Sequence, residues 1–250
     1  MTFGRLAFAL IATLAIGART LPAATTLASW QVPAAFPAST GNIPTGTTYL
    51  MPNINGTPTS GTLAGNSAAI LSTFHSMAAA TYISPAGNGS QYSFSSNNWS
   101  PSDYYQVVLP TTGVSDLQVS WDQARSSSGP AAFALEMSTD GTTFTRLMTY
   151  TVVQSGGGGA PGTWSTTNYN SLYTNTYDLP ETADNVASLY LRFTNIETAV
   201  SSASGSNRID NIAINGVPEP LSSIPEPRSV LVGGLLLAGL FLRQRRTKGF

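Results

Sequence analysis

Hydrophobic and polar positions alternate over short runs in the second half of the chain. Segments rich in Gly, Ser, Asn and Pro separate these runs, which is the spacing expected of strands in an antiparallel sandwich. No run between residues 25 and 216 has the period of a long amphipathic helix. We therefore predict an all-β fold, a two-sheet antiparallel sandwich that is jelly-roll-like. Its predicted strands span residues 104–109, 114–121, 131–137, 143–153, 188–194 and 208–215.

A turn signal joins two of these runs. The sequence STDG at residues 138–141 contains Asp-Gly, a pair that readily adopts the positive φ angles of tight hairpin turns. We therefore expect the runs 131–137 and 143–153 to form a hairpin. Trp121 ends an alternating run, so its large ring is expected in the core.

The first third of the chain has a weaker pattern. Residues 25–90 are rich in Thr, Gly, Ala and Pro and show little periodicity. They predict an edge strand near residues 29–32, then long loops, with a single short helix at residues 68–80.

The N-terminus has the layout of a secretory signal peptide. Arg5 precedes an apolar stretch at residues 6–18, and the small residues Ala23 and Ala24 follow it. The apolar stretch is short for a membrane-spanning helix. We therefore predict a signal peptide over residues 1–24 and export across the inner membrane by the Sec machinery.

The C-terminus carries three elements in a fixed order. The tripeptide Pro225, Glu226, Pro227 is followed by an apolar stretch at residues 229–242, and then by a basic cluster that contains Arg243, Arg245 and Arg246. The apolar stretch is shorter than the roughly 20 residues of a stable membrane span. Basic residues favour the cytoplasmic side, so both ends of the chain predict the same topology.

This order resembles the PEP-CTERM sorting signal of Gram-negative bacteria. The resemblance implies that an exosortase, a membrane-embedded transpeptidase-like enzyme, processes the protein at the motif while the apolar segment holds it transiently in the inner membrane. A second Pro-Glu-Pro lies at residues 218–220, but the copy at 225–227 adjoins the apolar stretch and is taken as the operative one. An ordinary tail anchor behind a Pro-rich stalk is the alternative.

These features predict five parts. They are a signal peptide (1–24), a β-sandwich domain (25–216), a Pro-rich linker with the motif (217–228), a hydrophobic segment expected to form a short helix (229–242), and a basic cytoplasmic tail (243–250). Residues 80–216 also resemble a β-sandwich domain that is frequent in PEP-CTERM proteins. The similar segments are GNGS at 87–90, SNNW at 96–99, DYY at 103–105, SGP at 128–130, STDG at 138–141 and RIDNI at 208–212. Ser102 stands where that pattern has Gly.

Composition and charge narrow the function further. The chain has no cysteine, which excludes disulfides, thiolate nucleophiles and cysteine-based metal sites. All twelve acidic residues lie between Asp103 and Glu226, where only four arginines accompany them. Such an acidic domain repels phosphate backbones, so we expect no nucleic-acid partner.

Catalytic residues are scarce. His75 is the only histidine, and no Gly-x-Ser-x-Gly elbow accompanies it, so neither a hydrolytic triad nor a zinc site is indicated. Carboxylate pairs drawn from Asp122, Glu136, Asp140 and Asp210 would be needed for a glycan hydrolase. Arg208 and Asp210 alternate in one predicted strand and should face the same side, as an ion pair or a loop anchor. We predict no enzyme activity.

Ligand binding is the remaining alternative. Trp99 and Trp164 lie in loop-like stretches and could present ring faces to sugars, whereas burial of both would count against that use. Asp210 and Asn211, with the loop 88–98, could supply oxygen ligands to calcium, although no calcium-loop motif is present and no cofactor is required. The leading interpretation is an exported, exosortase-sorted surface or matrix protein with a non-catalytic domain, associated with exopolysaccharide in a biofilm. The alternative is a carbohydrate-binding adhesin module, and a glycan hydrolase is the third.

Overall fold

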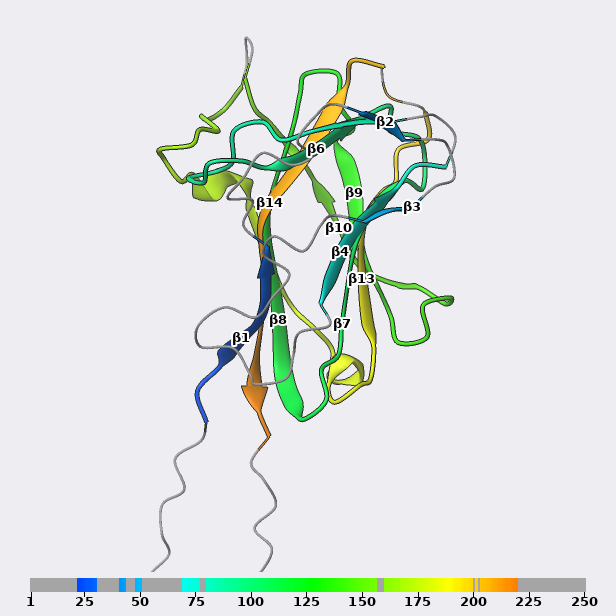
Figure 1. The fold of residues 1–250 in the computed structure, drawn as a ribbon, viewed down its shortest axis with the longest axis vertical. Helices are drawn as coiled ribbons and strands as arrows, with labels where there is room; N and C mark the ends of the chain where they lie inside the picture. The colour runs from blue at the N-terminus through cyan, green and yellow to red at the C-terminus, as the bar shows by residue number, and fades with distance from the viewer. Residues whose placement is uncertain are drawn as a thin grey trace, which may run out of the picture.

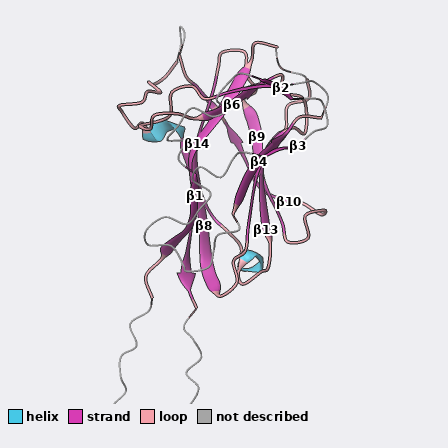
Figure 2. Cartoon of the chain, in the orientation of Figure 1, coloured by secondary structure: helices cyan, strands magenta, loops and turns pink. Residues whose placement is uncertain are grey.

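The computed structural model describes residues 22–30, 41–43, 48–50, 69–76, 80–156, 160–199, 201 and 203–219, with the backbone alone at 41–43 and 48–50. These residues form two β-sheets packed face to face, as Figure 1 shows. Helical structure within them is limited to the 3-10 turns η1 (Ser171–Tyr173) and η2 (Glu181–Ala183), drawn in cyan in Figure 2. The predicted all-β, two-sheet antiparallel sandwich is confirmed.

The first sheet has eight strands. Its central path runs β11-β8-β14-β6-β5-β2, with β1 also paired to β14 and β12 also paired to β8. All these pairings are antiparallel except that of β11 with β8. The strands are β1 (Thr25–Trp30), β2 (Gly41–Ile43), β5 (Ala80–Ile83), β6 (Phe94–Asn97), β8 (Val114–Arg125), β11 (Val153–Gln154), β12 (Thr174–Asp178) and β14 (Ser206–Pro218).

The second sheet has six strands in the order β10-β9-β13-β7-β4-β3, all antiparallel. The strands are β3 (Thr48–Leu50), β4 (Ile70–Phe74), β7 (Tyr104–Leu109), β9 (Ala132–Ser138), β10 (Thr145–Thr151) and β13 (Leu189–Asn195).

The core lies between the sheets and is rich in aromatic rings. On β7 every second side chain is buried, because successive residues of a strand point to opposite faces. Trp121 is fully buried, as predicted, with its ring 4.9 Å from that of Phe193 and 5.2 Å from that of Tyr150. Burial of this aromatic area from both sheets is the main driving force that holds the sandwich together.

Most predicted strands are confirmed, with ends that shift by a few residues. The hairpin of β9 and β10 forms as expected, and Gly141 at its turn has a φ of +74°. Besides β4, five strands in the described residues were not predicted, namely β2, β3, β5, β6 and β12. They are short, so their alternation is weak, and pairing with neighbouring strands stabilises them.

The predicted helix at residues 68–80 is wrong. Residues 70–74 form β4, which pairs with β7, and β5 begins at Ala80. Leu71 and Thr73 point inward with exposures of 2% and 0%, and the Thr73 hydroxyl donates to the carbonyl of Tyr104 at 3.0 Å. Pairing with β7, rather than the small-residue content, decides the conformation here.

The first and last described strands lie side by side. Thr25 is opposite Gly216 and Ser29 is opposite Ala213, so the chain enters and leaves the sandwich at one end (Figure 1). The edge strand predicted near residues 29–32 begins earlier, at Thr25, and residues 31–32 lie outside the described part. The upstream Pro-Glu-Pro copy begins at Pro218, the last residue of β14. The amide of Glu219, which follows, donates to the Gly113 carbonyl at 2.8 Å.

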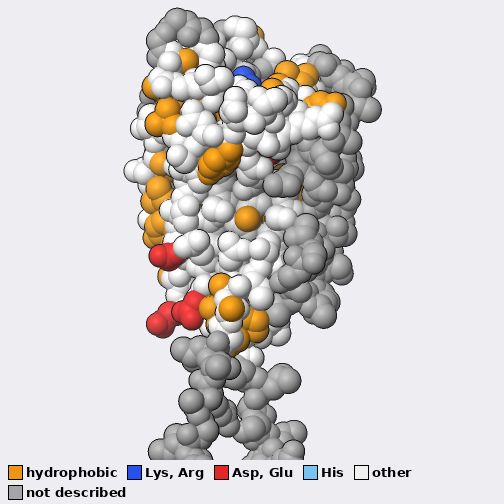
Figure 3. Space-filling view, turned by 90° about the vertical axis from the view of Figure 1, so that its left-hand side faces the viewer, with side chains coloured by type: hydrophobic (Ala, Val, Ile, Leu, Met, Phe, Trp, Pro, Cys, Tyr) orange, Lys and Arg blue, Asp and Glu red, His pale blue; other side chains and the backbone are white. Residues whose placement is uncertain are grey.

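The predicted signal peptide, the motif at 225–227, the hydrophobic segment and the basic cluster all lie outside the described residues. Among the residues that are described, no helix has the length and apolar character needed to cross a membrane. Figure 3 shows the molecule from the side of the eight-stranded sheet, where charged side chains are few and carboxylates gather toward the end at which the chain enters and leaves.

Candidate functional site

A row of polar side chains crosses the outer face of the six-stranded sheet. Arg146 of β10 is directly opposite Glu136 of β9, and Arg192 of β13 is opposite both Glu136 and Gln106 of β7. Residues directly opposite each other in antiparallel strands share one face of the sheet. Arg146, Glu136, Arg192 and Gln106 therefore form one continuous line, which we call the cross-strand row.

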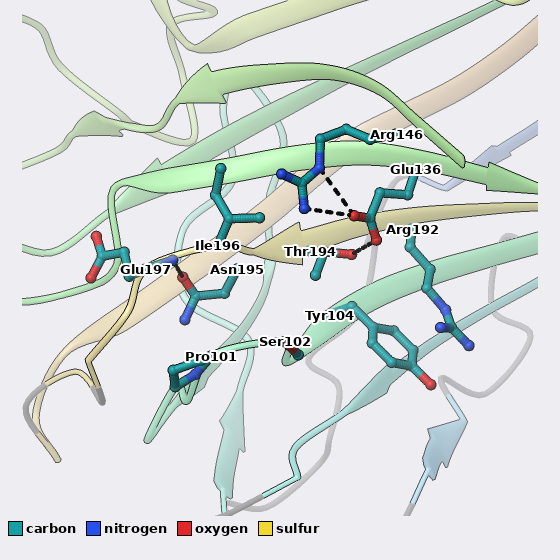
Figure 4. A pocket seen from close by; sticks show the side chains of 10 residues that line it. All are labelled: Pro101, Ser102, Tyr104, Glu136, Arg146, Arg192, Thr194, Asn195, Ile196 and Glu197. Atoms are coloured by element: carbon teal, nitrogen blue, oxygen red, sulfur yellow. Dashed lines mark hydrogen bonds and ion pairs between the residues drawn. The ribbon is translucent and has the colours of Figure 1, made fainter. Parts of the chain in front are cut away.

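Glu136 is held from two sides, as Figure 4 shows. Arg146 Nη2 lies 3.1 Å from Glu136 Oε1, and the Thr194 hydroxyl donates to Glu136 Oε2 at 2.9 Å. The side chain of Glu136 is 16% exposed and that of Arg146 is 52% exposed. The carboxylate is thus compensated and fixed, while its arginine partner remains accessible to solvent.

Arg192 is fixed by stacking. Its guanidinium carbon lies 4.0 Å from the ring centre of Tyr104 and 3.6 Å from that of Phe144, and Phe74 stacks in turn on Tyr104 at 5.4 Å. The Arg192 Nε donates to Gln106 Oε1 at 2.8 Å. Burial lowers the pKa of Arg192, while Tyr104 and Glu136 act in the opposite direction. Stacking and this hydrogen bond leave the terminal guanidinium nitrogens without a hydrogen bond to a described residue.

A pocket of about 480 Å³ opens beside the row. Besides Glu136, Arg146, Arg192 and Tyr104, its walls are formed by Thr194, Asn195, Ile196, Glu197, Pro101 and Ser102 (Figure 4). Its volume is in the range of small-molecule sites. Two guanidinium groups, two carboxylates and neutral hydroxyl and amide groups line it, so donors and acceptors are both present without an excess of either charge.

The two carboxylates of the pocket already have structural partners. Glu197 Oε1 accepts hydrogen bonds from the backbone amides of Ala131, at 2.5 Å, and Ala132, at 3.3 Å, and so holds the start of β9. Glu136 bonds Arg146 and Thr194, as described above. A glycoside hydrolase needs one carboxyl group as acid and another as base or nucleophile, and carboxylates committed in this way do not resemble such a pair.

The two loop tryptophans are not exposed platforms. Trp99 is fully buried and its Nε1 donates to the Ser96 carbonyl at 3.0 Å. Trp164 is 9% exposed, donates to the Ala86 carbonyl and packs edge-to-face on Tyr173 at 5.1 Å. Because both are buried, the expected stacking of a sugar ring on their faces is not available.

His75 forms a triad-like arrangement in the interior. Its Nδ1 lies 2.9 Å from Asp103 Oδ2 and its Nε2 lies 3.1 Å from the Ser96 hydroxyl. All three side chains are at most 2% exposed. Asp103 also accepts hydrogen bonds from the backbone amides of Ser76 and Ser100. A nucleophile must reach its substrate, and here the Ser96 hydroxyl is buried, so the arrangement links the segments of β4, β6 and β7.

A second polar cluster lies on the outer face of the eight-stranded sheet, beneath loops. Asp122 of β8 and Asp210 of β14 are opposite each other, and both are 1% exposed. Asn88, from the loop before β6, and Asn211, from the bulge in β14, contact these carboxylates. Burial raises the pKa of Asp210 to about 7, hydrogen bonds from Ser90 and Asn88 oppose this shift, and the neighbouring Asp122 carboxylate adds to it.

The expectation for Arg208 and Asp210 is met in part. Asp210 anchors the loop at 87–90, because its carboxylate accepts from the Asn88 amide at 2.9 Å and from the Ser90 hydroxyl. The partner of Arg208 is instead an aromatic ring, since its guanidinium lies 5.8 Å from the centre of Trp164. Among the described residues no ion pair joins Arg208 to Asp210.

Comparisons with known proteins give only distant similarities. No family model matches the chain, and no curated protein matches it. The K1 cleaved adhesin domain of Lys-gingipain from Porphyromonas gingivalis W83 is 17% identical, over 76% of this chain and 97% of that chain, with a TM-score of 0.39. TmCBM61 in complex with β-1,4-galactotriose is 9% identical, over 53% and 80%, with a TM-score of 0.31. The N-terminal cellulose-binding domain of Cellulomonas fimi β-1,4-glucanase C is 10% identical, over 62% and 93%, with a TM-score of 0.27. Similarity at this level assigns neither a family nor a ligand to this chain.

Sequence reasoning did not find the cross-strand row. Its members come from β7, β9, β10 and β13, and only the pairing register brings them together. Alternation within each strand could have placed Arg192 and Thr194 on one outer face. The Asp-Gly turn predicted that β9 and β10 are neighbours, but the sequence contains no signal that β13 and β7 lie beside them, so the whole pocket could not have been assembled from it.

Proposed function

We propose that this chain is a non-catalytic β-sandwich module that binds a carbohydrate in the pocket beside the cross-strand row. The observation that carries the proposal is the row itself, in which Arg192 is fixed by stacking and Glu136 by two partners. Fixed polar groups lose little side-chain freedom when a ligand binds, so their hydrogen bonds contribute to affinity.

The charge balance of the pocket favours a neutral, hydroxyl-rich ligand. A hydroxyl group both donates and accepts, so it can bond carboxylates and guanidinium groups alike. An anionic ligand would meet Glu136 and Glu197, and a cationic one would meet Arg146 and Arg192. The ring faces of Tyr104 are covered by Phe74 and Arg192, so binding here depends on polar contacts more than on stacking.

The position of the pocket suits display from a surface. It lies where β7 begins and β13 ends, next to Tyr104 and Asn195. The chain enters and leaves near Thr25 and Gly216, at the opposite end of the sandwich, where Val114 is opposite Pro218. An anchor or a sorting segment on either terminus would therefore hold the domain with its pocket pointing away.

The proposed biological setting follows from the sequence. The signal-peptide pattern and the Pro-Glu-Pro motif support export and processing by an exosortase, with release to the cell surface or to an exopolysaccharide matrix. Intact mass spectrometry of the surface-released protein tests this part, with and without the exosortase. A C-terminus near Pro227 that depends on the enzyme supports it, and the same full-length mass in both strains overturns it.

Affinity gel electrophoresis tests carbohydrate binding, with the full chain in a sugar-free detergent and gels that contain neutral, amino-sugar or uronic-acid polysaccharides. We expect retardation by a neutral polysaccharide, and its loss in Glu136→Gln. Glu181→Gln is the matched control, because Glu181 is exposed and lies in η2, outside the pocket. No retardation in any gel, or equal retardation of wild type and Glu136→Gln, would contradict the proposal.

A further inference from the structure

The buried carboxylates of the eight-stranded sheet have no cationic partner. Asp122 and Asp210 face each other across β8 and β14, and both are 1% exposed. The ion pairs found among the described residues are those of His75 with Asp103 and of Arg146 with Glu136, so neither Asp122 nor Asp210 takes part in one. Two buried carboxylates without a counter-charge are costly, and a bound cation or a proton on one of them would lower that cost.

The hydrogen-bond donors around this pair are distributed unevenly. Asp122 is well satisfied, because it accepts from Thr174 Oγ1 at 2.6 Å, from Asn88 Nδ2 at 2.9 Å and from Asn211 Nδ2 at 2.7 Å. Asp210 Oδ2 accepts from the Asn88 amide and from the Ser90 hydroxyl. Asp210 Oδ1 is buried and has no hydrogen-bond partner. A buried oxygen of this kind needs a ligand or a donor.

A proton on Oδ2 would leave that atom without a partner. The Ser90 hydroxyl lies 2.5 Å from Asp210 Oδ2 and 3.1 Å from the Tyr92 carbonyl, and it can donate to only one of them. A proton on Oδ2 could therefore be donated to Ser90, which would then donate to Tyr92. Oδ1 would still have no partner. A cation bound to Oδ1 would give this oxygen a partner and would also compensate the negative charge of the two carboxylates.

The loop at this site is shaped to close over Asp210. A Cβ at Gly87 would lie 2.5 Å from Asp210 Oδ2 and 2.6 Å from the Tyr92 carbonyl oxygen, so only glycine fits. Asn211, directly after Asp210, has a φ of +47° at a bulge in β14. Backbone and side-chain oxygens surround the carboxylates, including the carbonyls of Asn88 and Asn170, which accept hydrogen bonds from the amides of the cluster.

We propose that Asp210 Oδ1 is a ligand of a calcium ion held between the eight-stranded sheet and its covering loops. An all-oxygen environment with no sulfur or imidazole suits a hard cation. Asp122 contributes the second negative charge, and loop carbonyls and water complete the coordination. The described residues contain no group of three or more acidic or histidine side chains that could hold a metal. The affinity is therefore expected in the range of extracellular modules, with dissociation constants of about 10⁻⁴–10⁻³ M.

The ion would fasten two loops to the sheet. One is the loop that contains Gly87–Ser90, and the other contains Trp164–Asn170, whose Asn170 amide donates to Asn88 Oδ1 at 2.9 Å. The site is on the opposite sheet from the carbohydrate pocket and does not rest on the proposed function. Loss of calcium should therefore lower stability without removing the polar groups of the pocket.

Thermal unfolding of the full chain tests the site, after treatment with a chelator and titration with calcium or magnesium. We expect the melting temperature to rise by roughly 5–10 °C when calcium exceeds its dissociation constant about 100-fold, with a smaller response to magnesium. Asp210→Asn should lose this response and be at least as stable as the wild type in chelator, because it removes a buried charge. Asp116→Asn, which changes an exposed aspartate with a φ of +52°, should keep the full response.

Terbium luminescence provides a readout that does not depend on the stability of a variant. Terbium substitutes for calcium and is sensitised by nearby aromatic rings. Trp164 bonds the Ala86 carbonyl, and the Tyr169 backbone approaches Gly89, so both residues adjoin the site. We expect luminescence in the wild type that calcium displaces. The proposal is overturned if terbium gives no such signal and roughly 10 mM calcium, above the expected dissociation constant, leaves the melting temperature unchanged. It is equally overturned if Asp210→Asn responds like the wild type.

Discussion

The outer faces of the two sheets both carry carboxylates, but their surroundings differ. On the six-stranded sheet Glu136 is partly exposed and lies between two arginines and a threonine. On the eight-stranded sheet Asp122 and Asp210 are buried under loops, and the donors that reach them are neutral. The first face is complete without an ion and leaves polar groups for a ligand. The second leaves an oxygen of Asp210 without a partner.

This difference shows how one functional group, the carboxylate, serves two purposes. A paired carboxylate at a surface adds little to stability, because water screens it, so such a position is free to bind ligands. An unpaired carboxylate in the interior lowers stability unless something binds it. We therefore expect substitutions on the eight-stranded sheet to change stability, and substitutions on the six-stranded sheet to change binding.

The largest effect is expected for Gly87→Ala. The new methyl group would collide with Ser90, Asp210 and the Tyr92 carbonyl, so the loop cannot close and stability should fall by about 3 kcal/mol. Urea unfolding measures the change. Gly113→Ala is the comparison, because no atom lies within 4 Å of the added carbon. Its cost of about 1–2 kcal/mol comes from the φ of +74°, a backbone strain that Gly87 does not have. A loss at Gly87 smaller than that at Gly113 would mean that the loop around Asp210 yields to the added methyl group.

Asn88→Asp should sharpen the contrast between the faces. The change removes a donor to Asp122 and adds a third buried carboxylate, so in chelator it should cost about 2–3 kcal/mol. With calcium present, the added charge should strengthen binding of the ion, and the calcium-induced rise in melting temperature should exceed that of the wild type. A smaller rise than in the wild type would count against the calcium site.

Arg192→Lys tests the other face. Lysine keeps the charge but loses the planar group between Tyr104 and Phe144 and the hydrogen bond to Gln106. Stability should fall by about 1 kcal/mol, and carbohydrate affinity by about tenfold, equivalent to about 1.4 kcal/mol. Calorimetric titration with the retarding glycan measures the affinity. Unchanged affinity would place the ligand elsewhere.

The smallest change in stability is expected for Arg146→Gln. This arginine is half exposed, and its pair with Glu136 is screened by water, so removing it should change the free energy of unfolding by less than about 0.5 kcal/mol. Affinity for the glycan should still fall severalfold, since Arg146 is a wall of the pocket. A large loss of stability, measured by urea unfolding, would mean that the row is structural.

The sequence predicted the fold better than the site. Alternation located β7, β8, β9, β13 and β14, and Asp-Gly located the β9–β10 turn, because both signals are local. It failed at β4, where small and hydroxyl residues were taken as a helix, and at Trp99, whose loop-like context conceals a place in the core. The Asp-Gly turn brings Arg146 beside Glu136, but the place of Arg192 next to them depends on the pairing of β13 with β9, which local patterns do not encode.

The site around Asp210 was predicted from the sequence only in part. The sequence predicted that Asp210 and Asn211, with the loop 88–98, could supply oxygen ligands. It did not predict that Asp122 belongs to the same site. Only the register of β8 against β14 places the two carboxylates opposite each other. Burial of the pair depends in turn on the loop that carries Trp164 and Tyr173, far away in the sequence.

The central claim is that the pocket beside the cross-strand row binds carbohydrate, and the most direct measurement is an NMR titration that follows arginine side chains. The Nε–H of Arg192 donates to Gln106 in the row. The Nε–H of Arg125, in β8 of the other sheet, donates to the Val152 carbonyl. With the retarding glycan, we predict that the Arg192 signal and the amides of Thr194 and Asn195 shift while Arg125 stays in place. Shifts confined to Arg125 and the loop around Trp164, with Arg192 unchanged, would contradict the account.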